Sequence, residues 1–209
     1  MPSSLPGPAY RIHTTRTVLR CWQPGDASLL KAAIDASLEH LRPWMPWAHY
    51  EPEALQTKIE RLRRFRGEFD LGYDFVYGVF NLQETQVLGS TGLHKRLGEG
   101  AREIGYWIHK DYINLGLATE IAAALTKVAF TIDQMARVEI HCDQKNVRSA
   151  AIPRKLGFRH TTTLRQHPRS ADSTIRDTMI WTLLAHEYPS TPAAASPITA
   201  FDVAGRLLG

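Results

Sequence analysis

The spacing of apolar positions alternates between two periods along this chain, and each period predicts one kind of element. Runs rich in β-branched and aromatic residues predict strands at 18–22, 75–80, 86–93, 103–108, 137–142, 159–167 and 176–184. Apolar residues three or four positions apart predict helices from 26 to 38, and at 52–69, 118–134 and 147–156. Strands and helices mixed in this order indicate an α/β domain.

Three of the predicted strands follow one another with only short turns between them. Turn residues occupy 81–84 and 97–100, and strands joined so closely pair antiparallel. Later strands alternate with helices. The pattern therefore predicts a mixed sheet that contains an antiparallel meander.

Both ends of the chain lack this periodicity. A Pro/Gly/Ser-rich lead covers 1–9, and an Ala/Pro/Ser-rich tail covers 189–209. We therefore expect one domain over 10–188. Apolar side chains from Ile198 to Gly209 recur at near-helical spacing, which is compatible with a short terminal helix in the tail.

Composition narrows the class of protein. Apolar residues make up 44% of the 209 residues and charged residues 22%, and no apolar run is long enough to span a bilayer. The N-terminus lacks the basic start and apolar stretch of a secretory signal. With two cysteines and no paired CxxC motif, we expect free thiols, no metal site, no membrane partner and a cytoplasmic location.

The protein is mildly basic, with a formal net charge of +4 at pH 7 and a pI of about 9.2. Such an excess fits an acidic ligand, a nucleic acid or nothing specific. The one basic cluster, between Lys58 and Arg66, has the spacing of a solvated helix face, and no interleaving of aromatic and basic residues is present. A nucleic-acid-binding role rests on the pI alone, and we expect no nucleic-acid partner.

The segment around Gly116 offers candidate chemistry. Gly116 precedes a long apolar-periodic helix that has Ala118 and Thr119 in its first turn. Small residues let a ligand approach the backbone, and the unpaired N–H groups of a helix start attract phosphate oxygens. Alone, a glycine before a helix is most often only a turn, so the neighbouring segments decide its meaning.

Four segments in order carry a family resemblance: Glu103-Ile104-Gly105-Tyr106-Trp107-Ile108, Gly116-Leu117-Ala118-Thr119-Glu120, Asn146-Val147-Arg148-Ser149 and Lys155-Leu156-Gly157-Phe158. Together they resemble the GNAT superfamily of N-acetyltransferases, within it the RimJ/RimL branch. The resemblance spans about Thr17 to Tyr188. It implies an α/β fold with a GNAT-like mixed, mostly antiparallel central sheet of about seven strands, which is splayed at a coenzyme site and flanked by helices.

The resemblance also implies a binding site for acetyl-coenzyme A. Backbone groups of one loop would hold the pyrophosphate, and this loop comprises Leu115, Gly116, Leu117, Ala118 and Thr119. The backbone of Trp107, Ile108 and His109 would pair with the pantetheine arm like an added strand. Asn146 would hydrogen-bond the arm, and a role as helix N-cap is equally suited to it and compatible.

The loop departs from the pattern of the family. The usual first position is Gln or Arg, but here it is Ile113, and Asn114 and Leu115 stand where the branch often has Gly and a basic residue. A side-chain contact to phosphate is therefore lost, while the backbone contacts remain.

Acetyl transfer to an amine needs a base for the amine, donors for the oxyanion and an acid for the departing thiolate. The resemblance places the acid at Ser149; a first-turn serine that only bonds to backbone is the alternative. The glutamate that the branch uses as base has no counterpart in the stretch 164–168. We choose Glu103 instead, acting directly or through a water, with His167 second; an ammonium anchor or a surface residue remain alternatives for Glu103.

The acceptor side is less defined. Trp44, Trp47 and Tyr50 lie in a proline-rich connection that forms the acceptor groove in the resembled branch, and core packing is the alternative. Cys142 would need an activating base and an acyl-enzyme intermediate to act as a nucleophile, so we interpret it as a buried small residue.

The sequence thus predicts an acetyl-coenzyme A dependent N-acetyltransferase in which a primary amine attacks the thioester directly. The amine belongs to a protein N-terminus or to a small molecule, because resemblance of fold does not choose between them. A non-catalytic acyl-coenzyme A binding module is the alternative, favoured by the missing carboxylate. An exposed strand edge or the terminal helix would allow a homodimer.

Overall fold

The computed structural model describes residues 8–167 and 176–209, with only the backbone of residue 167. Within these ranges the chain forms one ten-stranded sheet in the order β10-β9-β1-β2-β3-β4-β5-β6-β8-β7. The strands are β1 (Arg11–His13), β2 (Val18–Cys21), β3 (Phe75–Phe80), β4 (Val87–His94), β5 (Ala101–Ile108), β6 (Arg137–Asp143), β7 (Arg159–His167), β8 (Arg176–Leu184), β9 (Thr199–Phe201) and β10 (Leu207–Leu208).

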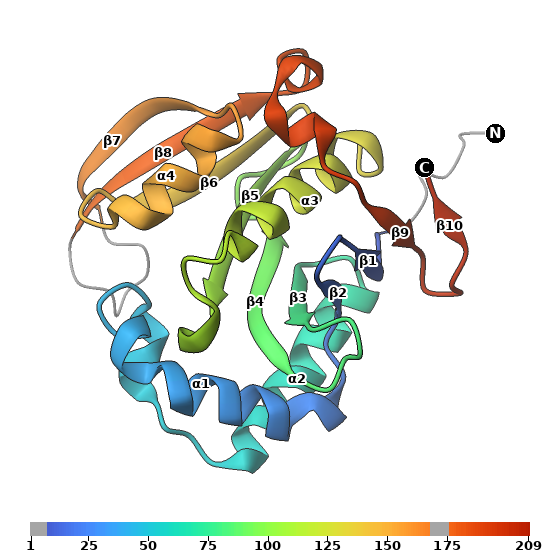
Figure 1. Ribbon diagram of the computed structural model, residues 1–209, viewed down its shortest axis with the longest axis vertical. Helices are drawn as coiled ribbons and strands as arrows, with labels where there is room; N and C mark the ends of the chain where they lie inside the picture. Colours follow the sequence, from blue (N-terminus) through green and yellow to red (C-terminus); the bar gives the residue numbers. More distant parts are fainter. Residues whose placement is uncertain (1–7, 168–175) are drawn as a thin grey trace.

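Four α-helices accompany the sheet in the described ranges: α1 (Ala27–Leu41), α2 (Leu55–Asp70), α3 (Leu117–Thr131) and α4 (Val147–Lys155). Short 3₁₀ helices η1 (Pro24–Asp26), η2 (Pro46–Tyr50), η3 (Lys110–Tyr112), η4 (Tyr188–Ser190) and η5 (Pro192–Ala195) lie in the connections. Figure 1 shows α1 and α2 gathered at one end of the view and α3 and α4 at the other. The predicted α/β class with flanking helices is confirmed.

The sheet has more strands than the predicted seven, because three short strands lie at one edge. β1 pairs with β2 and β9, and β9 pairs with β10, all antiparallel. Strands of two or three residues are too short to show a period of two. The short terminal helix considered for 198–209 is wrong: Ala200 is buried and its neighbours pair with β1, so part of the predicted tail is built into the sheet.

The two faces of the sheet carry different cores. Along β5, Ile104 and Ile108 belong to the larger core, to which α3 also contributes Ile121 and Leu125. Trp107 packs against the smaller core, which includes side chains of α1 and α2. Successive side chains of a strand point to opposite faces, so β5 is covered by α3 on one face and by the α1–α2 unit on the other.

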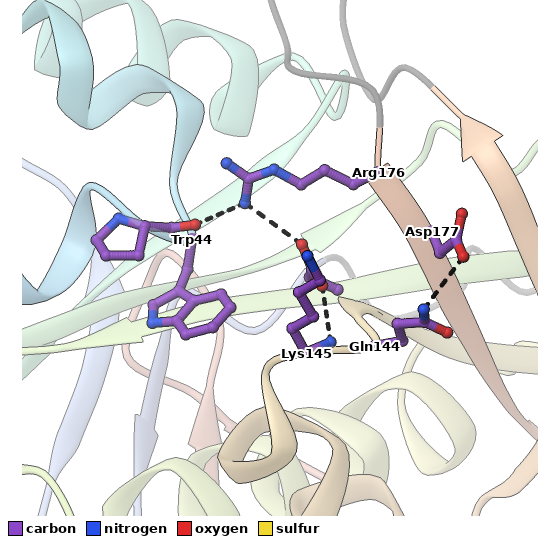
Figure 2. A pocket seen from close by; sticks show the side chains of 7 residues that line it. Trp44, Gln144, Lys145, Arg176 and Asp177 are labelled. Atoms are coloured by element: carbon purple, nitrogen blue, oxygen red, sulfur yellow. Dashed lines mark hydrogen bonds and ion pairs between the residues drawn. The ribbon is translucent and has the colours of Figure 1, made fainter.

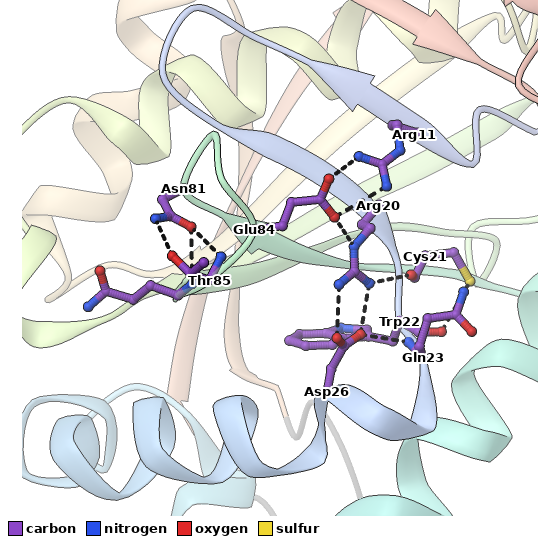
Figure 3. A network of polar contacts seen from close by, with 10 residues as sticks. Arg11, Arg20, Cys21, Trp22, Gln23, Asp26, Asn81, Glu84 and Thr85 are labelled. Atoms are coloured by element: carbon purple, nitrogen blue, oxygen red, sulfur yellow. Dashed lines mark hydrogen bonds and ion pairs between the residues drawn. The ribbon is translucent and has the colours of Figure 1, made fainter.

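A network of ion pairs fixes the start of α1 against β1 and β2 (Figure 3). Glu84, in the turn between β3 and β4, pairs with Arg11 of β1 and with Arg20 of β2. The other side of the Arg20 guanidinium binds both oxygens of Asp26, at 2.7 and 2.8 Å. The network therefore links β1, β2, the β3–β4 turn and the residue that precedes α1.

The sheet parts between β5 and β6. These two strands are parallel, whereas every other pair in the sheet is antiparallel. They pair only from Ala101 to Glu103 on β5 and from Arg137 to Glu139 on β6, although β5 continues to Ile108 and β6 to Asp143. The predicted splay is thus confirmed, and we call this opening the β5–β6 gap.

Candidate active site

A cavity of about 810 Å³ reaches both faces of the sheet at the β5–β6 gap. On the α4 side it is lined by Tyr106, Cys142, Asn146 and Ser149. On the α1–α2 side it is lined by Trp44, Trp47, Asp74, His94, Arg96, Glu103, Trp107 and His141. Side chains predicted for the donor and side chains predicted for the acceptor therefore share one cavity.

The loop before α3 has the backbone conformation of an open helix start. Asn114 and Gly116 have φ angles of 62° and 79°, both in the left-handed region, where glycine is at ease. Gly116 is the N-cap and has no side chain that could cap the helix. The first-turn N–H groups at Leu117, Ala118 and Thr119 have no acceptor within the helix itself, which suits them to an anion.

A side chain from the other end of the chain lies against this loop. Arg16, between β1 and β2, donates from Nη1 to the Leu115 carbonyl at 2.8 Å and from Nε to Glu120 at 2.6 Å. Its Nη2 is 3.6 Å from where a Cβ atom on Gly116 would lie. Thr14 also donates to the carboxylate of Glu120, at 2.6 Å. The loop thus has a cation beside it although its own sequence supplies none.

The three residues predicted to meet the pantetheine arm do not present their backbones in the same direction. The N–H of His109 donates to Leu88 on the β4 side, at 2.8 Å. Backbone groups of alternate residues in a strand point to opposite neighbours. Trp107 and His109 therefore face β4, and Ile108 faces the gap. The carbonyl of Ile108 accepts a hydrogen bond from His40 Nε2 of α1 at 2.8 Å.

Asn146 and Ser149 lie together at the start of α4. The side-chain oxygen of Asn146 accepts from the Ser149 N–H at 3.1 Å, so Asn146 is the N-cap. The hydroxyl of Ser149 is 3.2 Å from that of Tyr106, close enough for a hydrogen bond. Burial raises the pKa of Tyr106 above its ordinary value, against the opposing effect of its bond to Ser149. Tyr106 therefore stays protonated at neutral pH and can donate.

Glu103 is fixed in an ion pair. Its side chain is 3% exposed, so the surface alternative is wrong, because β5 buries the residue under Arg96. Nε and Nη2 of Arg96 donate to its two oxygens at 2.7 and 2.8 Å. Nδ1 of His141 lies 3.5 Å from one of these oxygens. The two bonds from Arg96 therefore occupy both oxygens of the Glu103 carboxylate.

The aromatic residues predicted for the acceptor groove divide. Trp44 and Trp47 line the cavity, and the Trp47 ring lies 6.1 Å from that of Trp107. Tyr50, the last residue of η2, is 62% exposed and is not among the lining residues. The structure therefore brings two of the three to the site.

A smaller cavity of about 560 Å³ adjoins the first, since Trp44 and Asp143 line both. Figure 2 shows Arg176 reaching across from β8. Its Nη1 donates to the carbonyl of Pro43 at 2.6 Å and lies 3.6 Å from Asp143. Arg176 thus joins the α1–α2 connection, which carries Trp44, to the strands beyond the gap.

Two further predictions concern Cys142 and His167. Cys142 is 5% exposed, packs in the larger core and also lines the cavity. The side chain of His167 lies outside the described residues.

In the ranges that the structure describes, no three His, Cys, Asp or Glu side chains gather so as to hold a metal ion. Likewise, none of the described helices is long and apolar enough to cross a membrane.

Sequence reasoning missed three polar side chains of this site. Arg16 is about a hundred residues from the loop it contacts, so no local pattern could join them. Tyr106 stands in one of the quoted motifs, and its alternation with Trp107 could have placed it on the α4 side. His94 is the last residue of β4 and directly follows the predicted strand 86–93, where a polar side chain commonly enters a site.

Known proteins resemble the chain in sequence and in fold. The acetyltransferase (GNAT) domain family matches residues 16–159. "Putative ribosomal N-acetyltransferase YdaF" of Bacillus subtilis is 28% identical over 142 residues, which is 67% of this chain and 76% of that protein.

Two solved structures show the same fold. RimJ of Mycobacterium smegmatis, in complex with a coenzyme A disulfide, superposes with a TM-score of 0.77 at 22% identity, covering 91% of this chain and 95% of the other. The ribosomal-protein-S5-alanine acetyltransferase of Vibrio fischeri superposes with a TM-score of 0.72 at 16% identity, covering 85% and 98%.

Proposed function

The chain belongs to the GNAT family of acetyltransferases, and from that premise we propose that its acceptor is the free amino group at the N-terminus of a protein. The enzyme transfers an acetyl group from acetyl-coenzyme A to an amine. The observation that carries the proposal is the cavity at the β5–β6 gap, which joins the predicted donor side to an aromatic acceptor side.

The donor fits the α4 side of the gap. Its pyrophosphate would meet the first-turn N–H groups of α3 after Gly116, with Arg16 supplying a cation beside them. Its amide-containing arm would lie along β5, where Ile108 turns its backbone to the gap. Asn146 and Ser149, at the start of α4, would then flank the arm near the thioester.

The chemistry needs no covalent enzyme intermediate. The amine nitrogen bonds to the thioester carbon, and the carbon–sulfur bond breaks. Tyr106 and Ser149, which share a hydrogen bond at 3.2 Å, would return a proton to the departing thiolate. Holding both reactants in one cavity supplies much of the rate, because it replaces a collision by a positioned attack.

The acceptor proposal rests on the relatives and on the shape of the site. YdaF is named a putative ribosomal N-acetyltransferase, and the Vibrio fischeri structure is named a ribosomal-protein-S5-alanine acetyltransferase. The acceptor side here is an open groove that includes Trp44, Trp47 and Trp107. Such a groove accommodates the first residues of an extended peptide.

A thiol-release assay with acetyl-coenzyme A tests the proposal. With peptides that have a free N-terminus, the enzyme should release coenzyme A as a free thiol, and mass spectrometry should place the acetyl group on the α-amine of the peptide. The same peptides with a blocked N-terminus and a free lysine are the matched controls and should not react. Turnover of small amines without turnover of any peptide would rule out the proposed acceptor class.

The same assay addresses the non-catalytic alternative. A binding module would gain thermal stability with acetyl-coenzyme A but release no thiol with any amine. The cytoplasm is the proposed location, since acceptors of the kind named for YdaF are made there. A homodimer and the lack of nucleic-acid or membrane partners stay predictions.

A further inference from the structure

We propose that His94, oriented by Asp74, is the base that accepts the proton of the acceptor amine. This inference rests on the proposed transfer to an amine and names a residue for it. Glu103 was the choice from sequence, and both its oxygens are bound by Arg96. The same face of the sheet holds a second proton acceptor with a different arrangement.

Asp74 fixes the imidazole of His94. Nδ1 of His94 lies 2.7 Å from Oδ2 of Asp74, and Oδ1 of Asp74 accepts from the Lys95 N–H at 3.2 Å. Burial alone would raise the pKa of Asp74, but bonds from His94 and from the N–H groups of Lys95 and Phe75 lower it. The carboxylate is therefore charged at neutral pH and accepts from Nδ1–H. That leaves the lone pair of the neutral ring on Nε2.

The backbone leaves room for this ring. Gly92 on β4 and Gly105 on β5 face each other across the strand pair. A Cβ atom on Gly92 would lie 2.7 Å from Nε2 of His94, and one on Gly105 would lie 3.3 Å from it. Side chains at these positions would displace the imidazole. Nε2 thus lies over the Gly92–Gly105 pair, between β4 and β5, and β5 is the strand that borders the gap.

His94 and the Tyr106–Ser149 pair lie on opposite sides of the gap and line the same cavity. His94 faces the α1–α2 side, because its register partner on β5 is Glu103, whose side chain points away from α3. The amine approaches from this side in the proposed function. A base on the acceptor side and an acid on the donor side is the arrangement that direct attack requires.

The charges around His94 come from several elements. Beyond Asp74, the titratable and charged groups that line the same cavity are Glu103 of β5, Arg96 of the β4–β5 loop, His141 and Asp143 of β6, and Arg61 and Arg64 of α2. Glu103 is balanced by Arg96 at 2.7 Å. Arg61 is bound to Glu53 at 2.7 Å. Lys95, the next residue of the chain, donates from Nζ to the Gly72 carbonyl at 2.8 Å.

The proton balance closes without an added reactant. The amine nitrogen bonds to the acetyl carbon, and its proton moves to Nε2 of His94. The carbon–sulfur bond breaks, and the thiolate takes a proton from the Tyr106–Ser149 pair. The imidazolium returns its proton to solvent, which also restores the hydroxyl pair. Imidazole suits this role because it exchanges protons near neutral pH.

The test compares His94→Ala and Asp74→Asn with wild type, using whichever amine the wild-type enzyme acetylates. Because any amine that the wild-type enzyme acetylates can be used, this test does not depend on whether the acceptor is a protein N-terminus. We expect His94→Ala to lower kcat/KM about 100-fold. Asp74→Asn should lower kcat/KM about 10-fold, because the imidazole of His94 is then no longer held in the tautomer that carries its proton on Nδ1. Affinity for acetyl-coenzyme A should stay within about twofold for both.

Two readouts separate a base from a structural residue. The limb of the pH–rate profile that depends on the base should disappear in His94→Ala, and added imidazole should restore part of the rate. His141→Gln is the matched control, as a second histidine of the same cavity, and should keep the limb. Loss of the limb in Glu103→Gln while His94→Ala keeps it, or a lack of rescue by imidazole in a folded His94→Ala, would overturn the proposal.

Discussion

At the residue scale, the site depends on a few hydroxyl and carboxylate contacts that cross between elements. Tyr106 belongs to β5 and Ser149 to α4, and their hydroxyls meet at 3.2 Å beside the gap. The alternative from sequence was a serine that bonds only to backbone. The buried tyrosine gives Ser149 a side-chain partner, and the two hydroxyls form the pair that we proposed as the proton donor.

Removing one hydroxyl tests this pair. Tyr106→Phe keeps the ring and should lower kcat about 10-fold to 100-fold, because the thiolate loses its proton source. Ser149→Ala should act in the same direction. If the two act as a unit, the double variant should cost little more than the worse single one. Steady-state kinetics of the three variants provide the comparison, and strictly additive losses would show two independent roles.

At the residue scale, the amino-acid sequence predicts some side-chain positions and not others. The alternation Ile104, Tyr106, Ile108 against Trp107 fixes which face each side chain takes, since a strand permits no other pattern. The ion pair between Glu103 and Arg96 could not be predicted, because it depends on how the β4–β5 loop returns over the strand. Choosing a base from residue type alone therefore favoured a carboxylate that is already bound.

At the scale of elements, the loop before α3 is held by the β1–β2 connection, which is far from it in sequence. The β1–β2 connection carries Arg16 to the start of α3, where it binds the Leu115 carbonyl and the Glu120 carboxylate. Glu120 stands in the first turn of α3 and would repel a phosphate if it were unpaired. Arg16 neutralises that charge and leaves Nη2 near Gly116.

Arg16→Ala should therefore weaken the binding of coenzyme A about 10-fold, a loss of about 1.4 kcal/mol. Calorimetry with coenzyme A and with pantetheine, which lacks the phosphates, distinguishes the cause. Affinity for pantetheine should not change. Arg206→Ala, at an exposed arginine near the C-terminus, is the control. An equal loss for both ligands would mean that Arg16 only supports the loop.

The sequence predicted the long helices and strands. The helices α2 to α4 and the strands from β3 to β8 match the periodic segments to within a few residues. The strands β1, β9 and β10 did not, because two or three residues carry no period and their pairing joins opposite ends of the chain. Arg16 was missed for the same reason: the loop that presents it is adjacent to α3 only in the folded sheet.

At the scale of the whole molecule, one buried ion pair couples folding to pH. Asp133 follows α3, and its carboxylate lies 4.0 Å from Nε of Arg102 on β5. Burial raises the pKa of Asp133 to about 6, against the smaller opposing effect of Arg102. The folded protein therefore binds this proton more tightly than the unfolded chain does. The folded state loses stability as the pH rises from about 4 to about 6.

Comparing wild type with Asp133→Asn isolates this effect. The difference in free energy of unfolding, wild type minus variant, should fall by roughly 3 kcal/mol between pH 4 and pH 7, since one pKa unit is about 1.4 kcal/mol. Urea denaturation at both pH values provides the measurement. A difference that does not change with pH would show that Asp133 titrates in the folded protein as it does in the unfolded chain.

The β5–β6 gap also bears on how the molecule opens. Sheets usually fray from their outer strands, where amide hydrogens exchange fastest. Here the described strands from β10 to β5 and from β6 to β7 form two ladders joined by three residue pairs. Beyond those pairs, no register pair joins the described residues of β5 to those of β6, so exchange can start at the centre of the sheet. If the donor lies along β5 as proposed, it would occupy this opening, and amide exchange in β5 and β6 should slow when coenzyme A binds.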